Sequence, residues 1–133
     1  MIALCCHHRC EWHHFLGKKY MVEAFKLESI NEFQTLCGLT SWATCGTGKP
    51  RDSAVNSQND SGAAQGRYDR LGLDKQRREA LGRKVKRILD FARCQFVREN
   101  CGLDDVGLSY YCQPDLTLEN VVLLGKCTSG TLS

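Results

Sequence analysis

The chain has 133 residues, of which 42% are hydrophobic and 25% are charged, and these proportions are ordinary for one soluble globular domain. Its longest apolar runs, such as Val121–Leu124, fall far short of the roughly 20 residues that a membrane helix needs. The apolar start, Met1–Leu4, is too short for a secretory signal. We therefore expect a protein that is not exported and that resides inside the cell, in the cytoplasm or the nucleus.

Cysteine content and the distribution of charge indicate what kind of protein this is. Nine cysteines in a chain without a secretory signal indicate reduced thiols or metal ligands rather than a disulfide framework. The net charge is only +3, but eleven Lys or Arg and five Asp or Glu fall between Arg67 and Glu99. This stretch carries about +6 and the rest of the chain is slightly acidic.

The first predicted element is a strand at Met1–Cys6, an apolar run that ends in a polar cluster. Such a run is typical of a buried parallel strand that delivers functional groups at its carboxyl end. Because a parallel strand needs neighbouring strands and covering helices, we expect further elements upstream of Met1. A short helix is predicted at Trp12–Phe25, although Gly17 weakens it.

A polar segment separates this first part from the rest. Residues from Thr44 to Gly66 are rich in Gly, Ser, Thr, Asn, Asp and Gln and have almost no large apolar side chains. This composition is typical of disorder. We assign residues 47–66 to a disordered linker within the domain.

A longer helix is predicted from its N-cap Asp74 to about Asn100, before the stop signal Gly102. Its apolar face repeats every three or four residues and comprises Leu81, Val85, Ile88, Leu89, Ala92 and Phe96. Its charged face comprises Arg83, Lys86, Arg87, Asp90 and Arg93. Two strands, at Leu108–Cys112 and Asn120–Gly125, are expected to pair antiparallel and close the chain.

Four segments resemble a known family. Residues 5–10 read CCHHRC, and residues 41–46 read SWATCG. The third segment is the helix from Leu81 to Phe96, and the fourth is Leu118–Val121, which reads LENV. In this order the segments resemble the eukaryotic tRNA 2′-O-methyltransferases that modify nucleotide 4 of the acceptor stem.

The resemblance implies methyl transfer from S-adenosylmethionine (AdoMet) to a ribose 2′-hydroxyl of tRNA. Residues 1–133 would then be the C-terminal part of a class I, Rossmann-like AdoMet methyltransferase domain, a doubly wound α/β fold that ends in an antiparallel strand pair. The cofactor loop and the family's CHHC zinc modules would lie upstream of Met1. We therefore expect this fragment to be inactive alone, and we assign it no cofactor-binding residue. The partner would be tRNA, with neither DNA nor a membrane, and the oligomeric state stays open.

The candidate catalytic residues are His7, His8 and Arg9. They follow the predicted first strand, at the edge where open α/β sheets bind ligands. A neutral histidine there can accept the proton of a ribose hydroxyl, and Arg9 can hold a phosphate through two parallel hydrogen bonds. Alternatively the three residues only cap the strand and pair with neighbouring backbone. The reaction also does not require a histidine base if the hydroxyl is positioned in line with the sulfonium.

The candidate RNA-binding residues lie on the long helix and are Arg83, Lys86, Arg87 and Arg93. Sequence-independent contact with phosphates is the expected mode. The alternatives are a face that is merely solvated and, for Arg93, a side chain that points into the domain. Trp42 can stack on a base or pack in the interior.

Two rival functions remain: a non-catalytic RNA-binding module that uses the basic helix, and a small zinc-binding protein. The potential zinc ligands are Cys5, Cys6, His7, His8, Cys10, His13 and His14, with Cys37 and Cys45 as a distant pair. They are crowded and lack the two separated ligand pairs of structural zinc sites. Buried reduced cysteines are therefore favoured, and we assign no metal site.

Overall fold

The computed structural model of the chain describes residues 1–133 apart from 5–6, 8–9, 45–70, 114–115, 117–118 and 128–133. The described elements are β1 Ile2–Leu4, the 3₁₀ turn η1 Trp12–His14, α1 Lys18–Phe25, α2 Ile30–Thr44, α4 Lys75–Asn100, β2 Asp105–Tyr110 and β3 Val121–Lys126. Helices and strands are both present, as the predicted α/β class requires. The predicted linker at 47–66 lies outside the described residues. None of the described helices is long and apolar enough to cross a membrane.

The three strands form one sheet in the order β1-β3-β2. Strand β3 lies antiparallel between the other two, and its Leu123 is opposite Ala3 of β1 and Leu108 of β2. The predicted antiparallel pair at the end of the chain is therefore confirmed. Strand β2 begins and ends slightly earlier than predicted.

The first strand is predicted to be buried and parallel, but in the described sheet it is parallel only to β2, which is not its neighbour. Strand β1 lies at an edge of the described sheet, and its hydrogen-bonded neighbour is the antiparallel β3. The side chain of Ile2 is 76% exposed. A short apolar run does not distinguish an edge strand from a central one, because its residue types are the same in both.

Helix α4 begins and ends where its capping signals predict. The Asp74 carboxylate accepts a hydrogen bond from the backbone N–H of Arg77 at 2.8 Å, which satisfies one of the free donors of the first turn. The helix ends at Asn100. Gly102 then adopts a positive φ of 60°, a conformation that glycine takes without steric cost.

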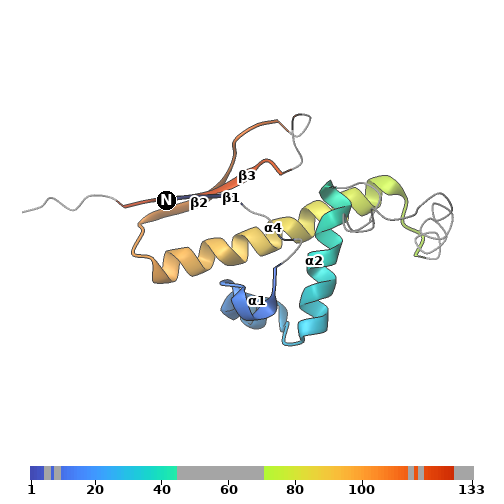
Figure 1. Ribbon diagram of the computed structural model, residues 1–133, viewed down its shortest axis with the longest axis horizontal. Coiled ribbons are helices and arrows are strands. Elements are labelled where there is room, and N and C mark those ends of the chain that lie inside the picture. The colour runs from blue at the N-terminus through green and yellow to red at the C-terminus, as the bar shows by residue number, and fades with distance from the viewer. Residues whose placement is uncertain (5–6, 8–9, 45–70, 114–115, 117–118, 128–133) are drawn as a thin grey trace, which may run out of the picture.

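Helix α4 runs between two layers, with the sheet on one side and α1 and α2 on the other (Figure 1). The core on the helical side comprises Phe15, Met21, Leu27, Phe33, Cys37, Val85, Leu89 and Ala92. The core beneath the sheet comprises Cys94, Val97, Val106 and Leu123. The predicted apolar face is confirmed at Leu89 and Ala92, both fully buried. Helix α4 therefore buries two of its faces.

Burial of two faces overturns part of the predicted charged face. Lys86 and Asp90 were expected in solvent with Arg83, yet both are buried. The expectation assumed a helix with a single apolar stripe against one layer. A helix enclosed by two layers also buries charges that lie between its two apolar stripes, provided that they find partners.

No helix is predicted for residues 30–44, yet α2 occupies them. Its buried residues Phe33, Cys37 and Thr40 follow helical spacing, but intervening glycine, serine and threonine residues lower its helix propensity. Packing against α4 supplies the stabilisation that propensity lacks.

The predicted helix at Trp12–Phe25 is divided into η1 and α1, and Gly17 is the N-cap of α1. A Cβ atom at Gly17 would lie 2.6 Å from the backbone carbon and from the Cβ of Ala92. Only glycine therefore allows α1 to approach α4 this closely.

Gly82 gives a similar close approach between α2 and α4. A Cβ atom there would lie 2.6 Å from the backbone nitrogen of Ala43 and 2.9 Å from the carbonyl oxygen of Leu39. We expect Gly82→Ala to destabilise the chain by about 1–3 kcal/mol in urea unfolding, because the α2 backbone must move. Gly38 of α2 is the matched control, since its added Cβ would meet no described atom within 4 Å. Gly38→Ala should stabilise the chain by up to about 1 kcal/mol through helix propensity, and equal effects of the two changes would contradict the close packing.

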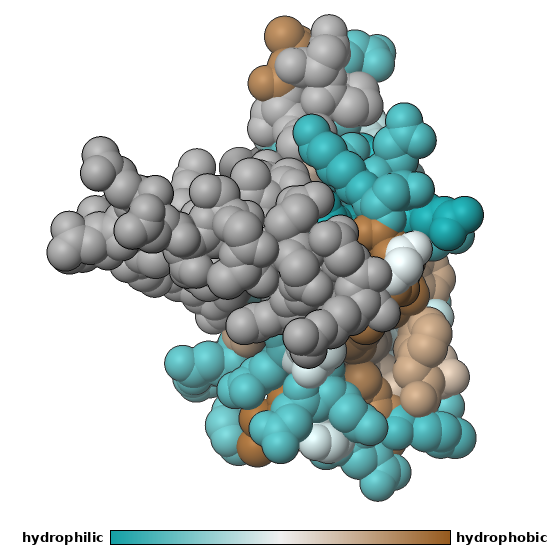
Figure 2. All heavy atoms as spheres, turned by 90° about the vertical axis from the view of Figure 1, so that its right-hand side faces the viewer, coloured by the Kyte–Doolittle hydropathy of each residue, from teal (hydrophilic) through white to brown (hydrophobic). Residues whose placement is uncertain are grey.

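Figure 2 looks onto the end of the molecule where α4 begins. On the described part of this face, hydrophilic residues gather in separate groups with hydrophobic residues between them. Exposed side chains of the first turns of α4 include Lys75, Gln76, Arg77 and Arg83. The beginning of α4 therefore carries accessible positive charge.

Candidate functional site

The carboxyl ends of β1 and β2 lie at the same edge of the sheet. Leu4 of β1 and Ser109 of β2 are both opposite Val122 of β3, so β1 and β2 run parallel on either side of β3. Open α/β sheets bind their ligands beyond the carboxyl ends of the parallel strands. We call this side of the sheet, with the segments that leave or enter it, the carboxyl edge.

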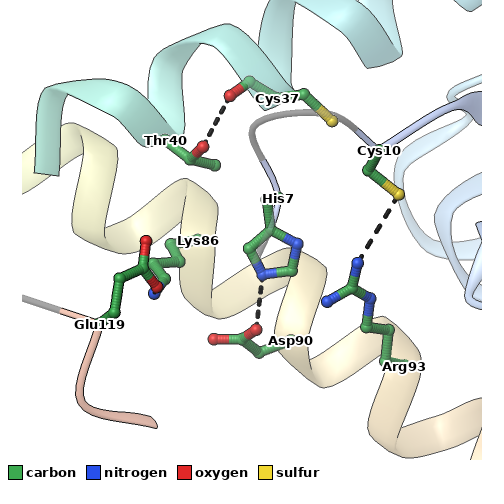
Figure 3. Close-up of polar contacts among 8 residues, drawn as sticks. All are labelled: His7, Cys10, Cys37, Thr40, Lys86, Asp90, Arg93 and Glu119. Atoms are coloured by element: carbon green, nitrogen blue, oxygen red, sulfur yellow. Dashed lines mark hydrogen bonds and ion pairs between the residues drawn. The ribbon is translucent and has the colours of Figure 1, made fainter. Parts of the chain in front are cut away.

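His7 follows β1 and lies inside the molecule, against α4. Its Nε2 is 2.6 Å from Oδ1 of Asp90 (Figure 3). Both side chains are buried, and only 1% of His7 is exposed. The two residues are 83 positions apart in the sequence, so this contact fixes the segment after β1 to the middle of α4.

The His7–Asp90 pair holds a neutral histidine. Burial lowers the pKa of His7 below its usual value and outweighs the hydrogen bond to the Asp90 carboxylate, which raises it, while the charges of Arg93 and Lys86 lower this pKa further;. At neutral pH the Nε2–H therefore donates to the Asp90 carboxylate. The other ring nitrogen, Nδ1, is buried and has no hydrogen-bond partner among the residues that the structure describes. A carboxylate that orients a neutral imidazole is typical of a general base, but His7 is too enclosed to touch a substrate in this arrangement.

Lys86 connects α4 to the segment that enters β3. The residue is 6% exposed, and its ammonium group contacts the carboxylate of Glu119 (Figure 3). Asn120 is also buried, and its side-chain amide donates to the carbonyl oxygen of Cys112 at 3.3 Å. These contacts hold the two sides of the β2–β3 connection together at the carboxyl edge.

Arg93 points toward the N-terminal segment, as the alternative for this residue anticipated. One of its Nη groups donates to Sγ of Cys10 at 3.6 Å (Figure 3). Its guanidinium lies 5.5 Å from the centre of the Phe15 ring. With the His7–Asp90 pair one turn earlier on α4, this contact holds the CCHHRC segment at two points.

Arg83 and Arg87 lie one turn apart on α4 and reach the surface. Arg83 is exposed, and its guanidinium is 3.8 Å from the carboxylate of Glu79. Arg87 is half-buried and donates to the hydroxyl of Tyr110 at 2.7 Å. Of the four predicted RNA-binding residues, Arg83 is therefore exposed, Arg87 and Arg93 are half-buried, and Lys86 is buried.

The other residues singled out from the sequence are His8, Arg9 and Trp42. His8 and Arg9 lie outside the described residues, so their catalytic roles stay predictions. Trp42 is half-buried, and its Cβ lies 3.1 Å from the position that a Gly82 Cβ would occupy. The pairing of Asp90 with His7 was not predicted, and the signal that could have indicated a buried acid is the single Asp inside the apolar run Ile88–Ala92.

Among the described residues, no group of three or more His, Cys, Asp or Glu side chains is arranged to hold a metal ion. Cys5, Cys6 and Cys45 lie outside the described residues. Burial raises the pKa of the Cys37 thiol to about 11. A thiol with this pKa is protonated at neutral pH and is a poor metal ligand.

Comparison with known proteins gives this site a context. The profile of the family described as Methyltransferase TRM13 matches residues 1–126, which include every strand and helix described above. The chain belongs to the TRM13 methyltransferase family. The resemblance found from the four sequence segments is thereby confirmed.

Individual relatives agree with the family match. The tRNA:m(4)X modification enzyme TRM13 homolog of Homo sapiens is 36% identical over 141 residues, and that of Mus musculus is 34% identical over 140 residues. The tRNA:m(4)X modification enzyme TRM13 of Saccharomyces cerevisiae is 30% identical over 131 residues. Each match covers 92% of this chain but only 27–28% of the relative, so the chain corresponds to little more than a quarter of their length. No solved structure matches the chain.

Proposed function

We propose that this chain is part of an AdoMet-dependent tRNA methyltransferase that methylates a ribose 2′-hydroxyl at position 4 of the acceptor stem. The observation that carries the proposal is the family match over residues 1–126. The names of the relatives, which describe tRNA modification enzymes, support tRNA as the substrate. The four sequence segments support the ribose hydroxyl as the methyl acceptor.

The strand arrangement supports a class I, Rossmann-like domain, of which residues 1–133 would form the C-terminal part. In that arrangement a parallel sheet ends with one antiparallel strand, and here β3 is antiparallel to both β1 and β2. Helix α4 covers one face of this sheet, as the layers of an α/β domain require.

AdoMet would supply an electrophilic methyl group bound to a sulfonium. The described residues do not fit a site for it: no glycine-rich loop follows a strand among them, and the acid Asp90 is bonded to His7;. We therefore propose that the 133 residues alone neither bind AdoMet nor methylate tRNA, and that the zinc of the family modules is also held elsewhere. Calorimetric titration of the chain with AdoMet tests this, and saturable micromolar binding would contradict it.

His8 and Arg9 are the proposed contacts to the reacting ribose and its phosphate. They directly follow His7 in the sequence, and His7 is buried and bonded to Asp90. His7 and Asp90 then position this segment, and His8 acts as the general base. Arg9 holds a phosphate beside the hydroxyl.

A chimera tests the proposed reaction. The chain replaces the matched segment of the human relative, and the protein is assayed with labelled AdoMet and unmodified tRNA. We expect incorporation of methyl groups, and a nucleotide at position 4 that resists alkaline hydrolysis, because this hydrolysis requires a free 2′-hydroxyl. The human relative itself is the control. A methylated base, or a folded chimera that leaves tRNA unmodified, would contradict the proposal.

The exposed charges of α4 are the proposed phosphate contacts. Replacing Arg83 and Arg87 by Gln should weaken tRNA binding by the chain and reduce the slope of log K against log salt by about 1 for each lost contact. Lys126→Gln is the matched control, because Lys126 is an exposed lysine at the end of β3 and not on α4. An unchanged slope in the Arg83 and Arg87 variants, or an equal change in the control, would show that these side chains are merely solvated.

A further inference from the structure

Exposed aromatic side chains gather at the carboxyl edge. Tyr110, the last residue of β2, is 64% exposed, and Tyr111 is 51% exposed. They line a hollow of about 560 Å³ together with Cys112, Gln113 and Leu116. We call it the tyrosine hollow. Its volume falls within the range of about 300–1,000 Å³ that is usual for small-ligand sites.

Both tyrosines are held in place although they are not buried. The Tyr110 hydroxyl accepts a hydrogen bond from Arg87 at 2.7 Å, and the guanidinium of Arg87 lies 5.0 Å from the centre of the Tyr110 ring. The Tyr111 hydroxyl donates to the carbonyl oxygen of Glu119. Rings that are ordered before binding lose little conformational entropy when a ligand stacks on them.

The position of the hollow adds positive charge beside the aromatic rings. Arg87 contacts Tyr110 directly, and Arg83 lies one turn earlier on α4 with its side chain exposed. Flat rings next to a guanidinium group, with a second, exposed one a helical turn away, favour a ligand that combines a π-face with negative charge. A nucleotide has both features. An uncharged apolar peptide would not use the arginines.

We propose that the tyrosine hollow binds an unpaired nucleobase of the single-stranded 3′ end of tRNA, which continues the acceptor stem. This inference rests on the proposed tRNA function and adds a second contact to the phosphate contacts on α4. Bases inside a duplex are stacked on each other and offer no free face, whereas unpaired bases stack readily on aromatic side chains. The hollow therefore distinguishes a tailed acceptor stem from a blunt duplex.

The test measures binding of the full 133-residue chain to two RNAs, an acceptor-stem duplex with its unpaired 3′ end and the same duplex made blunt. The parent is expected to bind the tailed RNA more tightly. Tyr110→Ala and Tyr111→Ala should each weaken binding of the tailed RNA by roughly 5- to 100-fold and leave binding of the blunt RNA unchanged. The salt slope should stay as in the parent, because stacking releases no counterions.

Conservative variants and a distant aromatic residue provide the controls. Tyr110→Phe and Tyr111→Phe keep the ring and should bind the tailed RNA within about threefold of the parent, whereas Tyr110→Leu keeps apolar bulk without a π-face and should behave as Tyr110→Ala. Phe25→Ala removes an exposed aromatic side chain on α1 and should change neither affinity. Because every variant is measured on both RNAs, a misfolded variant would lose both and is recognised by circular dichroism.

Four results would overturn the inference. Folded alanine variants that bind the tailed RNA as the parent does would show that the rings make no contact with it. An equal loss for both RNAs in a folded variant would exclude an unpaired base as the ligand. A changed oligomeric state with unchanged RNA binding would assign the hollow to a protein partner. A parent chain that binds neither RNA would overturn this inference, whereas the proposed tRNA function is decided separately by the chimera.

Discussion

We expect His7→Ala to lower the free energy of unfolding at neutral pH by about 3–5 kcal/mol, because it removes one partner of a buried pair and leaves the Asp90 carboxylate in the interior. The side chains of both partners are fully enclosed, and their bond is 2.6 Å long. Urea unfolding monitored by circular dichroism measures the loss. His14→Ala is the matched control, since the His14 side chain is 81% exposed, and it should stay within about 0.5 kcal/mol of the parent.

The pH dependence of stability gives a second measurement on the same pair. Burial lowers the pKa of His7 in the folded chain. Below about pH 6.5 the unfolded state therefore binds a proton that the folded state does not bind. The contribution of His7 to the free energy of unfolding is therefore complete above that pH. It is lost as the pH falls, with a slope of up to about 1.4 kcal/mol per pH unit. His7→Ala should lack this slope. A parent whose stability does not decrease between pH 7 and pH 5 would contradict a neutral, buried His7.

Phe33→Ala is the second change for which we expect a loss of about 3–5 kcal/mol, the usual range for truncation of a buried phenylalanine. Phe33 is fully buried in α2, and its ring centre lies 5.0 Å from that of Trp12 and 4.9 Å from that of Phe15. Three rings at this separation interact beyond their buried area. The change should also shift the fluorescence of Trp12, because its ring loses a neighbour.

The matched control for Phe33 is Phe25→Ala, because Phe25 is a half-exposed aromatic residue on α1. A similar loss in both variants would mean that the helical core is not packed as described. A small loss in Phe33→Ala alone would indicate that η1 and the start of α1 can close the cavity by moving together.

Helix α4 and the last two strands could be predicted because their signals are local. The N-cap Asp74, the apolar face that includes Leu89, and Gly102 all act within one or two helical turns;. Helix α2 could not be predicted in this way, because Gly38 and the hydroxyl residues around Thr40 weaken its propensity. Its stability comes from contact with α4, which is distant in the sequence.

The candidate site was only partly predictable for the same reason. The CCHHRC segment showed that His7 stands at a strand end, but not that it turns inward to Asp90, 83 positions away. Helical periodicity placed Lys86 on a solvated face because it registers one apolar stripe and not a second layer. The exposure of Tyr110 and its contact with Arg87 likewise depend on tertiary structure.

The placement of α4 between two cores also determines how the molecule loses its structure. The core on the helical side and the core beneath the sheet both include residues of this one helix. Because each core depends on a folded α4, neither core can unfold completely while the other stays packed against α4. The two layers are thus parts of one cooperative unit rather than independent foldons. Amide hydrogens in the middle of α4, around Leu89, should then exchange only through global unfolding, and a ligand that stabilises the carboxyl edge should slow exchange in α2 as well.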